Sequence, residues 1–421
     1  MRRISFPIFI LLFSIIFSPV KIASAIGNPP PVKNGIDVMT DSAFAQIQGM
    51  RVALLTNHAG RTASGDATLD VFADQKKYIG REVCSFVGVF TPEHGYYTSV
   101  PAGELVDDGT IDGIPVFSLY GRERSPRRQD LEKFDALVID IQDIGIRSYT
   151  YISTVFYAIR ACAENGKKVF VLDRPNPIGG MVVDGNVIDA GRESFVSIIP
   201  TPYIHGCTVG ELAMMMNDEG WLGARCDLTV IRMQGWQRWM AWEDTDLMWL
   251  PTSPHIPTPD AVRGAAMLGI FGELGIISIG IGTTSPFQYI GSPQFDIEAV
   301  DRALLIEDFF GVKLIESRFR PFYGMYSGSD CTGWLLRFPL SNHFRPYTTG
   351  IRLMLGIRKV HPELFNGAKI SDRGKEMFRK VTGTDAILDG FLNRRSDEDI
   401  LRAARKGLNE FLDIRAKYLL Y

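Results

Sequence analysis

The stretch that decides the fold runs from Asp135 to Gly180 and reads "DALVIDIQDIGIRSYTYISTVFYAIRACAENGKKVFVLDRPNPIGG". Two short apolar runs, "ALVID" and "KVFVL", are rich in β-branched residues and have the length of buried strands. Between them lies a helical pattern, which the pair Asn165-Gly166 ends. Two buried strands joined by a helix predict that both strands lie parallel in one sheet.

The same alternation extends toward the N-terminus. Three more apolar runs are predicted as strands ending near Asn57, Glu93 and Gly121, and the segment "TLDVFADQKK" between the first two has a helical pattern. A further helix is expected to begin with Ser125 as N-cap and Pro126 at its first position. The sequence therefore predicts an α/β protein with a Rossmann-like, doubly wound parallel sheet covered by helices on both faces.

The domain boundaries follow from breaks in this pattern. Residues 26–35 contain three prolines and are expected to form an extended linker. The Rossmann-like catalytic domain is predicted for residues 36–225, and its last helix has Thr208 as N-cap and Glu211 at the capping-box position. Residues 226–421 mix helical and strand patterns, including a strand at "IISIGIG", and are expected to form a smaller α/β domain that closes the cleft.

The first 25 residues have the composition of an export signal. Arg2 and Arg3 precede an apolar run shorter than a membrane-spanning helix, and Ala23-Ser24-Ala25 forms a small-residue cleavage site. Cleavage is predicted after Ala25, and no cysteine follows for lipid attachment. The sequence therefore predicts a periplasmic or secreted protein without a stable membrane anchor after signal cleavage.

The composition argues against several partners and cofactors. With a formal net charge of -3 at pH 7, the chain lacks the basic excess of nucleic-acid-binding proteins. Five scattered cysteines without a CxxC pair are expected to be buried core residues. No dinucleotide-binding, P-loop, G-x-S-x-G or H-E-x-x-H motif is present, so neither a cofactor nor a metal is predicted.

Polar loops follow all five predicted strands of the first domain. Ligands bind outside the carboxyl ends of the strands in open parallel sheets, so these loops mark the candidate site. The candidate residues on them are Asn57, His58, Glu93, His94, Tyr120, Asp140, Asp143, Arg147, Ser148, Tyr149, Asp173 and Arg174. A glycine-rich turn of the second domain, with Thr283 in it and Glu273 shortly before it, is expected to close over this edge.

Glu93 is the candidate general acid. It follows a buried strand directly, and partial burial is expected to disfavour its charged form. His94 beside it can hydrogen-bond to a substrate hydroxyl. The alternative is that Glu93 caps the following turn and that His94 is a solvated loop residue.

The remaining loop residues are expected to bind the substrate or to orient a water. Asp140 and Asp143 could accept a sugar hydroxyl, or Asp140 could instead bond to backbone at the strand end. Arg147 precedes a helix N-terminus, a natural seat for a carboxylate, although a surface ion pair is the alternative. Asp173 and Arg174 could act in the same way or could only hold their own turn.

Several of these segments together resemble a known family. The motifs "TNHAG", "TPEHG", "DALVIDIQDIGIRSYTY", "DRPNPIGG", "PTPYIHGCTVGELA", "GIGTTSPFQYIGSP" and "FRPYTTGIRLM" occur in the order seen in the NamZ-like exo-β-N-acetylmuramidases. The resemblance extends from about Gly35 to the C-terminus. It implies a Rossmann-like domain facing a smaller one, and release of N-acetylmuramic acid from the non-reducing ends of peptidoglycan fragments. Glu93 occupies the position of the family's proposed catalytic residue.

The resemblance leaves parts of the mechanism open. Glycoside cleavage needs an acid, for which Glu93 is the candidate, and a second group that activates water or stabilises the oxocarbenium-like centre. Asp143 or the 2-acetamido group of the substrate could take this second role. The lactyl carboxylate of N-acetylmuramic acid is expected to meet Arg147 or Arg174. The alternatives to a muramidase are a non-catalytic glycan-binding protein and a metal-assisted amidase or esterase acting on muropeptides.

Overall fold

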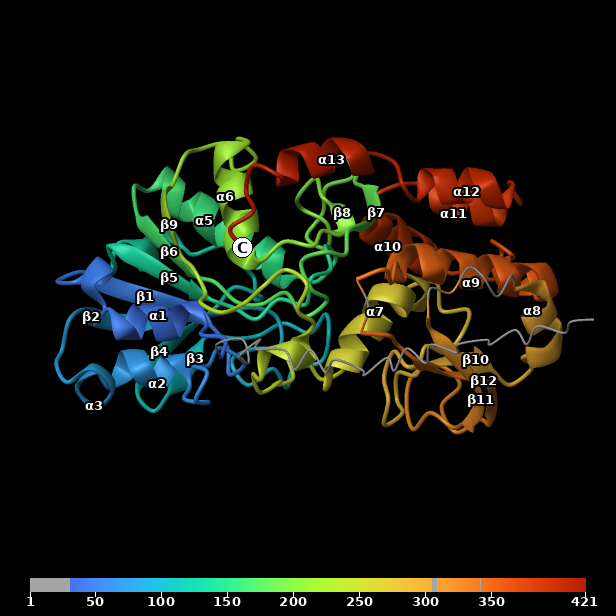
Figure 1. Ribbon diagram of the computed structural model, residues 1–421, viewed down its shortest axis with the longest axis horizontal. Coiled ribbons are helices and arrows are strands. Elements are labelled where there is room, and N and C mark those ends of the chain that lie inside the picture. The colour runs from blue at the N-terminus through green and yellow to red at the C-terminus, as the bar shows by residue number, and fades with distance from the viewer. Residues whose placement is uncertain (1–30, 305–308, 310, 341) are drawn as a thin grey trace, which may run out of the picture. The chain divides into compact units, whose positions relative to one another are not determined.

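A seven-stranded sheet forms the core of the first half of the chain (Figure 1). The strand order is β3-β4-β2-β1-β5-β6-β9, and every neighbouring pair is parallel except β3 with β4. The mainly parallel sheet confirms the predicted α/β fold. The strands are β1 (Arg51–Thr56), β2 (Ser85–Thr91), β3 (Gly109–Ile111), β4 (Ile114–Ser118), β5 (Ala136–Asp140), β6 (Lys168–Leu172) and β9 (Asp227–Ile231).

The computed structural model describes residues 31–304, 309, 311–340 and 342–421. The predicted signal peptide and the start of the predicted linker lie outside the described residues. The described end of the linker packs against the folded chain: Val32 is buried, and Lys33 forms an antiparallel bridge with Gln234. None of the helices in these ranges is long and apolar enough to cross a membrane.

Helices cover both faces of the seven-stranded sheet. Figure 1 shows α5 (Tyr151–Glu164) and α6 (Val209–Asp218) on one side and α1 (Gly35–Asp41) and α2 (Thr68–Ala73) on the other. Alternate residues of the strands point to the two sides. In β5, Leu137 and Ile139 belong to the cluster with α5 and α6, whereas Ala136 and Val138 belong to the opposite cluster. Burial on both faces explains why each strand is a continuous apolar run.

Several helix ends differ from the expected ones. The single helix predicted after β1 is two helices, α2 and α3 (Gln75–Ile79), separated at Asp74, whose side chain caps the second. The short α4 (Arg128–Leu131) begins after Arg127 instead of Ser125. The predicted cap of α6 is confirmed: Thr208 and Glu211 form a capping box.

The second half combines a small antiparallel sheet with a group of helices (Figure 1). The sheet has the order β10-β12-β11, and "IISIGIG", predicted as a strand, contributes only an isolated bridge between Ser278 and Gly291. A two-stranded sheet, β7 with β8, precedes it. The remaining elements are β7 (Asp184–Val187), β8 (Pro202–Ile204), β10 (Tyr289–Ser292), β11 (Lys313–Phe319), β12 (Cys331–Arg337), η1 (Ala45–Ile47), η2 (Trp242–Thr245), η4 (Pro362–Phe365), α7 (Pro259–Gly272), α8 (Ile297–Ala303), α9 (Pro346–Val360), α10 (Asp372–Thr382), α11 (Ala386–Leu392), α12 (Asp397–Ala403) and α13 (Leu408–Arg415).

Segments beyond residue 225 return to the first half. Strand β9 pairs with β6 at the edge of the large sheet, although it lies past the predicted end of the first domain. Phe411 and Tyr418 pack in the same core as α5 and α6. The hydroxyl of Tyr421 donates to Asp173 Oδ2 at 2.7 Å. The second half of the chain therefore begins and ends in the core of the first.

The five cysteines are all buried, as expected from their scattered positions, and all five are free. Burial raises the pKa of each thiol, to about 11 for Cys84 and Cys226 and to about 12 for Cys207. A thiol that stays protonated in an apolar core is a packing residue and a poor nucleophile. The described residues therefore form no disulfide bond.

Arg147 joins segments from the two halves of the chain. Its side chain is 1% exposed, and its Nη1 donates to the carbonyl oxygens of Asn186 at 2.7 Å and Thr201 at 2.5 Å. Its Nη2 donates to the carbonyl oxygens of Val381 at 3.2 Å and Thr382 at 2.7 Å. These last two carbonyls end α10, where helical partners are missing and a cation is favoured.

The position of Arg147 corrects the expectation that it receives a substrate carboxylate. Its guanidinium also donates to Ser197 Oγ at 3.1 Å, so all three nitrogens bond to the protein. Burial lowers the pKa of Arg147 to about 10, which leaves it charged at neutral pH. We therefore assign Arg147 to the junction between the halves.

Replacing Arg147 by alanine is expected to destabilise the protein by about 3 kcal/mol or more, because several buried acceptors lose their donor at once. Arg147→Lys keeps the charge but has fewer donors, so an intermediate loss is expected. Urea denaturation measures both. Arg225→Ala, which removes a surface side chain that is 78% exposed, is the control. An unchanged unfolding midpoint for Arg147→Ala would contradict this role.

Candidate active site

A cavity of about 350 Å³ lies where loops after β2, β4 and β5 meet α7 and α10 of the second half. Its walls combine polar groups from both halves with apolar side chains. The polar residues are Glu93, His94, Tyr120, Ser148, Tyr149, Thr150, Tyr203, Ser253, His255, Glu273 and Arg373. The apolar ones include Ile144, Ile146, Val196, Ile256, Phe287, Met377 and Val381. The volume and mixed lining are typical of a small-molecule site.

Glu93 lies in the wall of this cavity, two residues after the end of β2. The residue is 5% exposed. Its Oε2 accepts a hydrogen bond of 2.5 Å from Thr150 Oγ1, and its Oε1 accepts one of 2.8 Å from the Gly103 amide. Thr150 is also the N-cap residue of α5. Two donors from separate loops therefore hold the Glu93 carboxylate in one orientation.

His94, the next residue, is held in an unusual backbone conformation. Its φ of 71° lies in the left-handed region, which non-glycine residues rarely adopt. Its Nδ1 donates to the Val100 carbonyl oxygen at 2.7 Å, so in the neutral ring Nε2 is the free acceptor. Backbone strain of this kind costs roughly 1–3 kcal/mol and concentrates at functional sites.

Tyr120 and His255 complete the polar wall near Glu93. Burial, together with the neighbouring Glu93 carboxylate, raises the pKa of Tyr120. Burial, together with the nearby His94, lowers the pKa of His255. His255 Nε2 lies 2.8 Å from the hydroxyl of Tyr323, an exposed side chain. Both Tyr120 and His255 are therefore held neutral at physiological pH, as hydrogen-bonding groups.

Glu273 and Arg373 belong to the second half of the chain and line the same cavity. Glu273 directly follows α7, and Arg373 lies in the first turn of α10. Although Glu273 is exposed, desolvation by the surrounding protein raises its pKa, and the charge of Arg373 opposes that rise. Among the described residues, Glu93 and Glu273 are the two carboxylates that line the cavity.

Asp140 and Arg174 do not line this cavity. Their side chains form an ion pair with each other. Arg174 Nε donates to Asp140 Oδ1 at 2.5 Å, and Nη2 donates to Oδ2 at 2.9 Å. Thr68 Oγ1 also donates to Asp140, and Arg174 Nη2 reaches the Arg61 carbonyl oxygen at 2.6 Å. This bidentate pair is buried, at 0% and 3% side-chain exposure, and it ties the loops after β1, β5 and β6 together.

Asn57 and His58 are covered by the chain segment that leads to the second half. Asn57 Nδ2 donates to the hydroxyl of Tyr151 at 2.9 Å, and that hydroxyl donates to the Thr252 carbonyl oxygen. His58 Nδ1 lies 3.2 Å from the Thr98 hydroxyl, which is bonded to the Pro251 carbonyl oxygen at 3.0 Å. Neither Asn57 nor His58 lines the cavity.

The side chains of Asp173 and Thr283 also form their hydrogen bonds within the protein, away from the cavity. Asp173 accepts hydrogen bonds from Thr208 Oγ1 at 2.7 Å and from the Gly210 amide at 2.8 Å, at the start of α6. Thr283 Oγ1 donates to the Gly280 carbonyl oxygen at 2.6 Å and so stabilises its own turn. Neither residue lines the cavity.

Asp143 is buried behind the cavity wall. Its Oδ2 accepts a hydrogen bond of 2.7 Å from the Gly145 amide and lies 3.9 Å from His205 Nε2. Its Oδ1 and His205 Nε2 have no hydrogen-bond partner among the described residues. Burial raises the pKa of Asp143 to about 7 and lowers the pKa of His205 to about 3. Asp143 does not line the cavity, so it is not placed there as a base.

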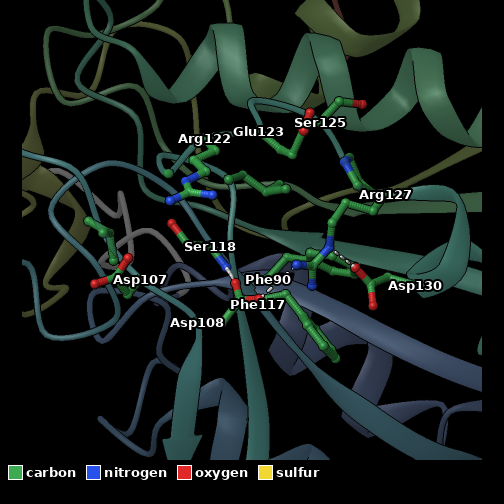
Figure 2. A pocket seen from close by; sticks show the side chains of 14 residues that line it. Phe90, Asp107, Asp108, Phe117, Ser118, Arg122, Glu123, Ser125, Arg127 and Asp130 are labelled. Atoms are coloured by element: carbon green, nitrogen blue, oxygen red, sulfur yellow. Dashed lines mark hydrogen bonds and ion pairs between the residues drawn. The ribbon is translucent and has the colours of Figure 1, made fainter.

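A second cavity, of about 390 Å³, lies beside the loop after β4 (Figure 2). None of its lining residues lines the Glu93 cavity. Figure 2 shows Arg127 bonded to Asp130, at 2.6 Å, and Arg127 also pairs with Asp108 at 2.9 Å. Because Arg127 is already paired with two carboxylates here and Glu93 lines the other cavity, we do not assign this pocket to the reaction.

Five polar residues of the Glu93 cavity were not predicted: Thr150, Tyr203, Ser253, His255 and Arg373. Thr150 stands one residue past a predicted candidate, and its place before a helix was the available signal. Ser253, His255 and Arg373 lie outside the loops of the first sheet. Their role in the cavity depends on how the second half packs, which no local pattern indicates. No group of three or more metal-ligating side chains occurs among the described residues.

The buried Asp143 makes stability depend on pH. Its pKa is about 7 in the folded protein and 3.8 in its ordinary state, so between these values the folded chain keeps a proton that the unfolded chain releases. Relative to Asp143→Asn, the free energy of unfolding of the wild type is therefore expected to fall as pH rises from about 4 to 7. The expected fall is at most about 1.4 kcal/mol per pH unit. Urea denaturation at several pH values measures the difference. Parallel pH profiles would contradict it, and the exposed Asp413→Asn is the control.

Comparisons with known proteins agree on one family. Residues 52–260 match the domain described as exo-β-N-acetylmuramidase NamZ, N-terminal, and residues 266–421 match the corresponding C-terminal domain. The chain is 35% identical over 396 residues to the peptidoglycan β-N-acetylmuramidase NamZ of Bacillus subtilis (strain 168), covering 93% of this chain and 92% of that protein.

Two solved structures from Bacteroides fragilis share the fold. Both are described as DUF1343 family proteins, and each comparison covers 93% of this chain and 99% of the other. The first has 36% identity and a TM-score of 0.86, and the second has 27% identity and a TM-score of 0.70. With both domains matched and a relative 35% identical along nearly its whole length, the chain belongs to the NamZ exo-β-N-acetylmuramidase family.

Proposed function

We propose that this protein is an exo-acting glycoside hydrolase that releases N-acetylmuramic acid from the non-reducing ends of peptidoglycan fragments. The observation that carries the proposal is the position of Glu93 in the cavity wall, oriented by Thr150 and Gly103. The relative from Bacillus subtilis is named for this activity on peptidoglycan. The pocket has room for a sugar, and its polar groups come from both halves of the chain.

Glu93 acts as the general acid in this proposal. Cleavage of a glycosidic bond requires a proton for the leaving oxygen while an oxocarbenium-like centre develops. Glu93 is next to Tyr120 and His94, which are positioned to bind sugar hydroxyls. Because the Glu93 carboxylate is held by two donors, it needs no reorganisation when the substrate binds.

The second chemical role falls to a group inside the cavity. Asp143, a candidate for it from the sequence, lies behind the wall, and Asp140 is bonded to Arg174. Two groups then remain for this role: Glu273, which could activate water, and the substrate's 2-acetamido group, which could attack the anomeric carbon itself. Glu273 lines the cavity from the second half of the chain, whereas Glu93 lines it from a loop of the first half.

Glu93→Gln is expected to reduce hydrolysis of a chromogenic β-N-acetylmuramide roughly 100- to 10,000-fold, because the amide keeps the shape but has no proton to give. Glu104→Gln, an exposed carboxylate of the same loop region, is the control. Activity is expected to survive EDTA. Inhibition by EDTA would favour a metal-assisted amidase or esterase, and tight muropeptide binding without any hydrolysis would favour a glycan-binding protein.

Glu273→Gln in the same assay separates the two candidates for the second role. A loss comparable to that of Glu93→Gln assigns water activation to Glu273. The alternative result is a small loss in Glu273→Gln together with slow cleavage of an N-trifluoroacetyl analogue, whose amide oxygen is a weaker nucleophile. This result assigns the second role to the 2-acetamido group of the substrate. A small loss with normal cleavage of the analogue would contradict both.

We further propose that the protein is exported and acts in the periplasm or outside the cell. The basic and apolar pattern of the first 25 residues and the Ala-x-Ala site support this location. Cell fractionation of the full chain, followed by N-terminal sequencing, is expected to find a mature form that begins at Ile26. Full-length protein in the cytoplasm would contradict the proposal.

A further inference from the structure

We propose that Arg373 binds the lactyl carboxylate of N-acetylmuramic acid and is the residue by which the cavity selects this sugar over N-acetylglucosamine. The inference rests on the proposed function, because it needs the sugar to be bound in the Glu93 cavity. The two sugars differ only in the lactyl ether, so the carboxylate is the charge that a selective site must recognise.

Arg373 is the single arginine or lysine among the residues that line the cavity. It is exposed, and the described part of the chain provides it with no hydrogen bond or ion pair. The nearby Glu273 influences it electrostatically, yet the two side chains do not form an ion pair within 4.0 Å. A permanent cation that the described residues leave unpaired in a sugar-sized cavity is available for an anionic ligand.

The two arginines predicted for this role are already occupied. Arg147 bonds to backbone and hydroxyl oxygens at the junction of the halves, and Arg174 forms its bidentate pair with Asp140. Freeing either guanidinium would leave buried acceptors or a buried carboxylate without a partner, which is costly. The binding of a substrate carboxylate therefore falls to Arg373.

The helix that carries Arg373 is suited to the whole lactyl group. Arg373, Met377 and Val381 are spaced four residues apart on α10, so they share one face of the helix, and all three line the cavity. Ser371 caps this helix through the Gly374 amide, and the helix N-terminus adds positive potential beside Arg373. The face thus offers a cation for the carboxylate and apolar surface for the lactyl methyl group.

The arrangement also places recognition and chemistry on different halves of the chain. Glu93 comes from the loop after β2, whereas Arg373 comes from α10. A guanidinium can bind a carboxylate through two parallel hydrogen bonds, which sets the orientation of the ligand as well as its affinity. Binding of the lactyl group by Arg373 would therefore orient the sugar toward Glu93.

The experiment compares two chromogenic substrates, a β-N-acetylmuramide and its lactyl methyl ester, which lacks the negative charge and adds one methyl group. The wild type is expected to prefer the acid roughly 10- to 100-fold in kcat/KM, the range for a hydrogen bond to a charged group. In Arg373→Ala this preference is expected to fall to near one, with hydrolysis of the ester largely retained. Arg373→Lys is expected to keep part of the preference, because the charge remains.

Lys380→Ala is the matched control, since it removes a positive charge from the same helix at a residue that does not line the cavity. A preference that persists in Arg373→Ala, or an equal loss on both substrates, would overturn the inference. Glu93→Gln, measured alongside, tests the site itself. Full activity in Glu93→Gln would reject the proposed site, whereas loss there with an unchanged preference in Arg373→Ala would reject only the role of Arg373.

Discussion

The guanidinium of Arg147 is the contact on which the geometry of the cavity most depends. It leaves the loop after β5 and bonds to four carbonyl oxygens, two of which end α10. That loop also carries Ser148, Tyr149 and Thr150, while α10 carries Arg373, Met377 and Val381. One buried side chain therefore sets the distance between the two walls. The arrangement is stable because a cation at a helix C-terminus satisfies carbonyls that have no partner within the helix.

The acidic residues at the sheet edge divide into two groups by their surroundings. Asp140 and Asp173 are fully buried and accept hydrogen bonds from an arginine, a threonine or backbone amides, so their charge serves the packing of the loops. Glu93 and Glu273 line the cavity, where a ligand can reach them. Asp140 and Asp173 do not line the cavity, so a substrate bound there does not reach their oxygens. The chemistry therefore belongs to the second group.

The accuracy of the sequence predictions depended on whether a feature follows from a local pattern of residues. Patterns of apolar residues predicted the parallel strands and the helices on both faces, because a strand buried on two sides has to be apolar throughout. The capping box of α6 was likewise predicted, since a cap depends on residues three apart. "IISIGIG" was wrong as a strand, because short apolar runs do not distinguish a strand from buried irregular chain.

By itself the sequence determined the fold class and the position of Glu93 in a P-E-H-G loop after a strand, and it predicted which edge of the sheet holds the candidate site. The strands, the helices and the loop of Glu93 follow from local patterns of residues. The edge of the sheet follows from the rule that ligands bind at the carboxyl ends of parallel strands. Only the tertiary structure decided which polar residues remain available to a ligand. Arg147 and Arg373 are both arginines beside a helix N-terminus in sequence, and only the packing of the two halves buries the first among carbonyls and leaves the second in the cavity.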